Sequence, residues 1–171
     1  MTMSEIGRRS LSRYVAGALF AVVLATWTAS GQTGGEDKAV IAVADAALAA
    51  ITRGDMTALT DLMLPEAVMF PTNTRANGVT AYRVRTRAEQ RAAPVTRKIT
   101  ERGFRPEARV SGPIAMVWYP YDLYVDGQWS HCGVDVFTLV RTEGQWRIST
   151  MSWSAEQPPA CEKHPDGPPK Q

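Results

Sequence analysis

A chain of 171 residues, 44% of them hydrophobic, has room for one domain that buries a core without relying on metals or many disulfides. Its 19 basic and 17 acidic residues give a pI near 8.7, but three of the basic residues and only one acid lie within residues 1–31. The remainder is therefore formally neutral, and its charge predicts no nucleic-acid partner and no membrane partner.

The first 31 residues have the layout of a secretory signal peptide. They contain a basic start, an uncharged apolar run, and small residues three and one positions before a cut ahead of residue 32: Arg8, Arg9, Arg13, 15–24, Ala29 and Gly31. The apolar run is shorter than the ~20 residues that cross a bilayer. We therefore predict a signal peptide over 1–31, a domain over 32–157 and an irregular Pro-rich tail over 158–171. The mature protein would be periplasmic or extracellular, without a stable membrane anchor.

Three helices are expected in the first half of the domain. After a spacer over 32–35, apolar residues recur at three- and four-residue steps from Val40 to Ile51, and Gly54 ends this helix. Asp55 can cap a second helix that reaches Met63 and is limited by Pro65. Thr86 and Glu89 form a capping box for a short third helix, which Pro94 stops.

Strands dominate the rest of the domain. A short strand at 68–70 and a returning strand at 79–85 flank an Asn-Gly turn. Further strands are predicted over 114–125, 128–140 and 146–153, joined by Asp126-Gly127 and Glu143-Gly144 turns. The fold class is therefore α+β, with about three helices laid on one face of a curved antiparallel sheet.

The chain resembles the nuclear transport factor 2-like superfamily, which includes SnoaL-like cyclases and ketosteroid isomerases. The residues that carry the resemblance are Arg53-Gly54-Asp55, 59–70 (LTDLMLPEAVMF), 114–118 (IAMVW), Tyr121, Asp126-Gly127, 130–137 (SHCGVDVF) and 146–148 (WRI). The later stretches are also similar to small proteins often labelled lumazine-binding. The resemblance implies a cone-shaped sheet wrapped around helices, with a pocket at its open end. It implies no single activity, because this fold hosts enzymes, carriers and docking modules.

Strand register suggests a candidate site. If Asp126-Gly127 is a two-residue turn, Asp122 faces His131 and Trp118 faces Asp135. An Asp–His pair suits acid/base chemistry, and Asp135 would act as a base in a dry site, so the candidate catalytic residues are His131, Asp122 and Asp135. The same face would provide a ligand pocket from Trp118, Tyr124, Trp129 and Phe137.

The alternatives for these residues are pocket lining without catalysis, and a structural contact. A bulge at Pro120 would shift the register by one and separate the pair.

Two further features concern covalent and charged contacts. Cys132 and Cys161 predict one disulfide in an oxidising compartment, the alternative being two unpaired thiols. Their spacing matches no zinc pattern, and no cofactor-binding motif is present, so we expect no metal and no cofactor. Residues 83–109 contain nine basic residues against three acids, which is either a solvated face or an attraction for an anionic ligand.

Three functions remain open. The favoured one is binding of a small, largely apolar organic molecule in the cone. The second is a cofactor-independent acid/base enzyme of the isomerase, cyclase or dehydratase type. The third is an interaction module that forms a homodimer through the outer face of its sheet.

Overall fold

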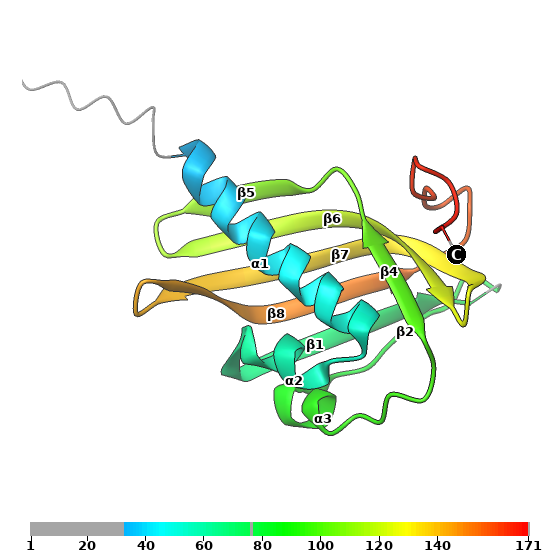
Figure 1. Ribbon diagram of the computed structural model, residues 1–171, viewed down its shortest axis with the longest axis horizontal. Helices are drawn as coiled ribbons and strands as arrows, with labels where there is room; N and C mark the ends of the chain where they lie inside the picture. The colour runs from blue at the N-terminus through cyan, green and yellow to red at the C-terminus, as the bar shows by residue number, and fades with distance from the viewer. Residues whose placement is uncertain (1–32, 76, 171) are drawn as a thin grey trace, which may run out of the picture.

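A computed structural model describes residues 33–75 and 77–170, and the predicted signal peptide lies outside them. The elements in chain order are α1 (Thr33–Arg53), α2 (Met56–Asp61), β1 (Met63–Thr74), β2 (Thr80–Tyr82), β3 (Arg85–Thr86), α3 (Arg87–Arg91), β4 (Ile99–Gly103), β5 (Glu107–Ser111), β6 (Ile114–Val125), β7 (Gln128–Thr142) and β8 (Gln145–Ala155). Figure 1 shows α1 lying obliquely across one face of the sheet, with α2 and α3 below its C-terminal end. Within the described ranges no helix is both long and apolar enough to cross a membrane.

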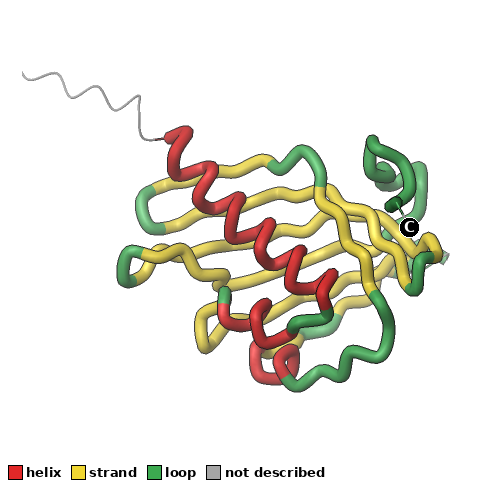
Figure 2. The backbone as a smooth tube through the Cα atoms, viewed as in Figure 1, coloured by secondary structure: helices red, strands yellow, loops and turns green. Residues whose placement is uncertain are grey.

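The sheet has the strand order β2-β1-β8-β7-β6-β4, with β3 paired to β1 and β5 paired to β6. It is a single curved sheet with helices on its concave side, as Figure 2 shows, so the predicted α+β cone is confirmed. One pair differs from the expected antiparallel pattern, because β1 runs parallel to β8. The predicted meander of β6, β7 and β8 is antiparallel throughout.

Helix α1 fills the concave side of the sheet. Its buried face repeats at three- and four-residue steps (Val40, Ala44, Ala47 and Leu48) and packs against Val117, Phe137, Leu139 and Ile148 of the sheet. The small alanines let the helix approach the strands closely. At its exposed edge, Asp45 accepts a hydrogen bond of 2.7 Å from the Tyr119 hydroxyl. The helix begins at Thr33, three residues before the predicted start, and so includes the expected spacer glycines.

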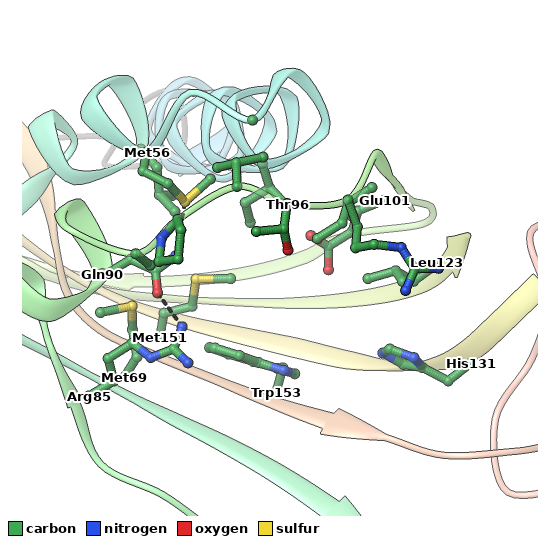
Figure 3. Close-up of a pocket in the computed structure, with 18 residues that line it drawn as sticks. Met56, Met69, Arg85, Gln90, Thr96, Glu101, Leu123, His131, Met151 and Trp153 are labelled. Atoms are coloured by element: carbon green, nitrogen blue, oxygen red, sulfur yellow. Dashed lines mark hydrogen bonds between the residues drawn. The ribbon is translucent and has the colours of Figure 1, made fainter. Parts of the chain in front are cut away.

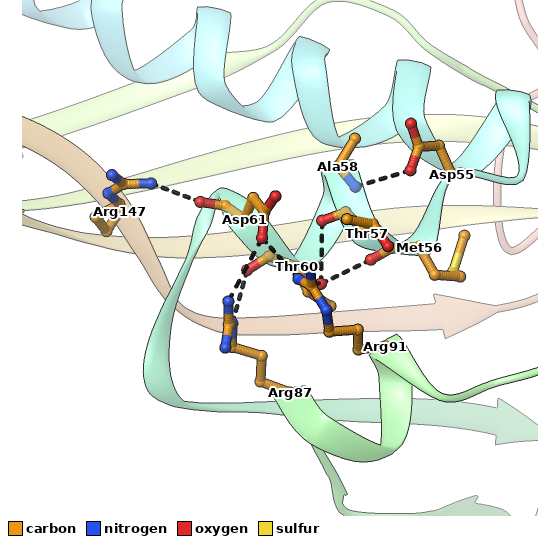
Figure 4. Close-up of polar contacts among 9 residues, drawn as sticks. All are labelled: Asp55, Met56, Thr57, Ala58, Thr60, Asp61, Arg87, Arg91 and Arg147. Atoms are coloured by element: carbon orange, nitrogen blue, oxygen red, sulfur yellow. Dashed lines mark hydrogen bonds and ion pairs between the residues drawn. The ribbon is translucent and has the colours of Figure 1, made fainter.

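The two short helices depend on tertiary contacts, since helices of 6 and 5 residues are unstable alone. Asp55 caps α2 by accepting from the Ala58 amide at 2.9 Å, and the predicted capping box of α3 is present. Figure 4 shows arginines gathered around the end of α2. Arg87 Nε donates to the Thr60 carbonyl at 2.7 Å, and Arg91 donates to Asp61 at 2.6 Å. These contacts fix α3 beneath α2.

The strand predictions were least accurate at the ends and edges. The second helix was expected to reach Met63, but β1 already begins there, and its register shifts between Met63 and Val68, where Pro65 is tolerated. Strands β4 and β5 were not predicted. The tail after Gln157 is irregular as expected, and the Cys132–Cys161 disulfide, which is present, ties it to β7 across 29 residues.

Gly133 in β7 lies so close to β8 that there is no room for a side chain at this position. A Cβ atom at this position would lie 2.0 Å from the carbonyl oxygen of Ser154, a backbone atom of β8 that cannot move without its strand. We expect Gly133→Ala to lower the free energy of unfolding by about 1–3 kcal/mol, as overpacking does. Urea denaturation of the mature protein measures this.

Gly35→Ala is the matched control, because a Cβ at this α1 position meets nothing within 4 Å. Alanine there should leave stability unchanged or raise it by up to about 1 kcal/mol. Equal denaturation midpoints for the Gly133→Ala variant and the unmodified protein would contradict the assigned packing.

Candidate functional site

A cavity of about 320 Å³ lies between the helices and the concave face of the sheet. Its walls are mostly apolar, with a few polar groups at the two ends, as Figure 3 shows. The lining comes from Ile51, Gly54, Met56, Leu59, Met69, Arg85, Gln90, 93–97, Ile99, Glu101, Leu123, His131, Met151 and Trp153. A largely apolar hollow with few polar groups is the usual form of a small-molecule site.

Glu101 is the acid that faces this cavity. Strand β4 is held to α1 through Thr52, whose hydroxyl accepts from the Glu101 amide at 3.0 Å and donates to its carbonyl at 3.1 Å. No hydrogen bond or ion pair joins the Glu101 carboxyl to any other described residue. Burial raises the pKa of Glu101 to about 8, so the carboxyl is neutral at pH 7 and can donate a hydrogen bond into the cavity.

Glu101 was not predicted from the sequence as a site residue. Its segment was interpreted only as part of a basic stretch, and Glu101 was counted there as one of three acids. The one local indication of a strand is the β-branched pair Ile99-Thr100 immediately before it, which is too short to distinguish from a loop.

Asp135 lies behind the cavity wall on the same side of the sheet. It is fully buried, its Cα partners are Tyr119 and Trp153, and neither carboxyl oxygen has a hydrogen-bond partner among the described residues. Burial raises the pKa of Asp135, and the neighbouring Glu101 carboxyl raises it further. Burial and mutual repulsion therefore both disfavour the ionised forms of these two acids.

His131 lines the cavity as a neutral imidazole. Burial lowers its pKa. The Tyr121 hydroxyl donates its proton to the Ser154 carbonyl at 2.7 Å, so its oxygen accepts from His131 Nε2 at 3.1 Å. Nδ1 then accepts from the Ser130 hydroxyl at 2.9 Å. Both ring nitrogens are therefore occupied, and His131 can take up a proton only by giving up the bond from Ser130.

The expected pairing of Asp122 with His131 is wrong. The predicted turn is present, and Val125 and Tyr124 face Gln128 and Trp129 as expected. Beyond that point β7 contains one extra residue, Ser130, so Leu123 faces His131 and Asp122 faces Cys132. The bulge considered at Pro120 lies instead at Ser130, with the same consequence: the register shifts by one and the pair separates.

Asp122 therefore points away from the cavity, on the outward face of the sheet. It is fully buried there, because the tail covers it. Its two oxygens accept from Arg102 at 2.9 and 2.6 Å, and the second also accepts from the His164 amide at 3.1 Å. A bidentate, buried ion pair of this kind is a structural clamp between β4, β6 and the tail.

The aromatic residues predicted as a ligand pocket divide between two locations, and none of them lines the cavity. Phe137 is fully buried in the core under α1. Trp118, Tyr124 and Trp129 lie on the outward face: Trp118 faces Val136, and Tyr124 packs edge-to-face on Trp129, whose ring lies 4.3 Å from the Lys163 ammonium of the tail. The apolar lining comes instead from methionines, from aliphatic side chains such as Leu59 and Leu123, and from Trp153.

Most arginines of the basic stretch have partners within the fold. Arg97 pairs with Asp126, Arg102 with Asp122 and Arg105 with Glu162, while Arg87 and Arg91 hold α2. The stretch is therefore not a single charged face.

Comparison with known proteins agrees with this architecture. The chain matches the SnoaL-like domain family over residues 40–158 and belongs to that family. No protein with a curated description matches it.

Solved structures share the fold. They include a protein of unknown function with a cystatin-like fold from Nostoc punctiforme (TM-score 0.58, 10% identity, covering 74% of this chain and 96% of that one). The beta subunit of a candidate aromatic-ring-hydroxylating dioxygenase from Novosphingobium aromaticivorans aligns with a TM-score of 0.60 and 13% identity. The alignment covers 72% of this chain and 91% of that one. A candidate dehydratase of the nuclear transport factor 2-like family from Streptomyces avermitilis aligns with a TM-score of 0.54 and 18% sequence identity. The alignment covers 71% of this chain and 96% of that one.

The raised pKa of Glu101 predicts that stability falls as pH rises. The folded state retains a proton that the unfolded chain loses above pH 4.5, so the unfolding free energy decreases between pH 5 and 8, by roughly 1 kcal/mol per pH unit. Glu101→Gln removes this contribution, and its stability should depend less on pH across that window. Urea denaturation at pH 5, 6, 7 and 8 measures the two slopes.

Asp135 contributes in the same direction, so the variant should retain part of the slope. The assignment would be wrong if the variant and the unmodified protein lost stability in parallel.

Proposed function

We propose that this domain binds a small, largely apolar organic molecule in the cavity between its helices and its sheet. The observation that carries the proposal is a hollow of about 320 Å³ with methionine, leucine and tryptophan walls and one neutral carboxyl, Glu101, directed into it. This volume is at the lower end of the range for small-molecule pockets, which suits a compact ring system.

The polar groups define how such a ligand would be oriented. The neutral Glu101 carboxyl offers a hydrogen bond to a carbonyl or hydroxyl oxygen, and Leu123 and Trp153 flank it with apolar surface. His131, with both nitrogens occupied, contributes a flat wall rather than a charge. A ligand with an apolar body and one oxygen at this end would accept a hydrogen bond from the neutral Glu101 carboxyl.

The uncharged fluorophore N-phenyl-1-naphthylamine is a direct probe of this cavity. The mature protein should bind it with enhanced fluorescence. Leu123→Trp, which fills the hollow beside Glu101, should weaken binding about tenfold or more. Fluorescence titration gives both dissociation constants, and native mass spectrometry of the purified protein reports any molecule that co-purifies.

Met116→Trp is the matched control, because Met116 lies on the same strand but on its outward face. It should leave probe binding unchanged. No probe binding and no co-purifying molecule, or equal affinity in the Leu123→Trp variant, would contradict the proposal.

An acid/base enzyme is the second candidate, favoured by one observation. A carboxyl with a pKa near 8 that faces an apolar cavity can exchange a proton with a bound carbon acid close to neutral pH. Glu101 fits that role better than the residues expected from the sequence, because Asp122 is clamped outside the cavity and Asp135 lies behind its wall. His131, which the sequence also suggested, stays a second candidate for this chemistry, because it lines the same cavity.

Proton exchange on a co-purified ligand distinguishes binding from catalysis. If the protein is an enzyme, it should exchange an acidic C–H of that ligand for deuterium, and Glu101→Gln should slow the exchange by about a hundredfold or more while binding persists. NMR in deuterated buffer follows the reaction. Glu107→Gln, at an exposed acid of β5 that lines no part of the cavity, should leave the rate unchanged; equal rates for the Glu101→Gln variant and the unmodified protein would exclude Glu101 as the acid/base.

Two broader expectations remain proposals. Export to the periplasm or beyond is supported by the Cys132–Cys161 disulfide, since such bonds persist in oxidising compartments. A homodimer is supported by the exposed Ile114 and Trp118 on the outward face of β6, where 57% and 46% of these side chains remain accessible.

A further inference from the structure

Arg85 is the charged group at the end of the cavity opposite Glu101. It lies in β3, with Met69 of β1 as its Cα partner, and its side chain lines the hollow beside Met69, Met151 and Trp153 (Figure 3). Its guanidinium makes one hydrogen bond among the described residues, from Nη1 to the amide oxygen of Gln90 at 2.6 Å. The Gln90 nitrogen in turn donates only to the Met56 sulfur, a weak acceptor.

No acidic residue neutralises Arg85 within the described structure. Its charge acts on Glu89, whose carboxylate accepts from the Thr86 amide at 2.7 Å and from the Thr86 hydroxyl at 2.9 Å. These hydrogen bonds lower the pKa of Glu89, and the charge of Arg85 lowers it further, but the two side chains form no ion pair. A guanidinium has five N–H donors, and here most of them have no acceptor among residues 33–75 and 77–170.

The contrast with the other arginines is informative. Arg97 also lines the cavity, but its charge is paired with Asp126. Among the described residues, Glu101 carries the one carboxyl that lines the cavity, and it is neutral at pH 7. The described lining therefore presents, at its Arg85 end, a positive charge that no ion pair neutralises and that lies beside apolar walls.

We infer that the ligand of this cavity carries an anionic group, a carboxylate or sulfonate on an apolar body, which pairs with Arg85. This inference rests on the proposed binding function and adds the charge of the ligand to it. The planar guanidinium suits two oxygens of such a group, with Gln90 holding it in place from the other side. The apolar body lies against Met69, Met151 and Trp153 and extends toward Glu101.

Two probes with the same ring system test the charge directly. N-phenyl-1-naphthylamine is uncharged, and 8-anilino-1-naphthalenesulfonate adds one sulfonate to it. In Arg85→Gln the sulfonate probe should lose about tenfold or more in affinity, while the uncharged probe loses little, because only the former uses the ion pair. Arg85→Lys, which keeps the charge, should restore part of the loss. Fluorescence titration of both probes against the unmodified protein and the two variants gives the six dissociation constants.

Arg109→Gln is the matched control, since this exposed arginine of β5 lines no part of the cavity. It should change neither affinity. Salt provides a measurement that needs no variant: raising NaCl should weaken binding of the sulfonate probe to the unmodified protein and leave the uncharged probe unaffected.

The outcomes separate the two proposals. If the uncharged probe binds but the ratio of the two affinities is the same in the Arg85→Gln variant and insensitive to salt, the inference about an anionic ligand is overturned while the cavity remains a binding site. If neither probe binds the unmodified protein, both the binding function and this inference are overturned.

Discussion

The extra residue in β7 determines which side chains face the inside of this domain and which face the outside. In a regular strand without a bulge at Ser130, Trp129 and His131 would lie on the same face, because they are two residues apart and side chains alternate. The bulge sends Trp129 outward to Tyr124 and the tail, and sends His131 inward to the cavity. Cys132 then points outward and can form its disulfide with Cys161. The internal site and the external attachment of the tail thus depend on the same local irregularity.

Neutralisation of buried groups is the second organising feature. Glu101 and Asp135 have raised pKa values because burial disfavours their charged forms, and the pKa of His131 is lowered for the same reason. Burial therefore favours the uncharged form of each of these three groups. The cavity can then select a ligand by hydrogen bonding at one end and by a single positive charge, that of Arg85, at the other.

The sequence predicted the elements that have strong local determinants. The strands after Ile114, the Asp126-Gly127 turn, the Asp55 cap and the Thr86 capping box all follow from residue types with fixed backbone preferences, and the structure contains them. The disulfide followed from the number of cysteines and the expected compartment. Strands β4 and β5 could not be predicted in this way. Both are only five residues long, and their charged side chains give a sequence pattern that is also typical of loops.

The candidate site was only partly predictable for a related reason. A one-residue bulge is decided by packing at the tertiary level, so the sequence could not place it at Ser130, and every pairing beyond it was displaced. His131 and Asp135 were expected on one face and do share the inward face, but Asp122 was assigned to the wrong one. Glu101 gave no local indication, because its role follows from the burial of β4 against α1.

The Arg102–Asp122 ion pair on the outward face and the Glu101 carboxyl on the inward face are connected through β4. Arg102 and Glu101 are neighbours on β4, so their side chains point to opposite faces. Arg102 is held by both oxygens of Asp122, and the tail closes over that ion pair through the His164 amide. Because the ion pair fixes the position and rotation of β4, it also fixes the direction of the Glu101 carboxyl. Asp122, which the sequence suggested as a catalytic partner of His131, therefore affects the cavity by positioning the strand that carries its acid.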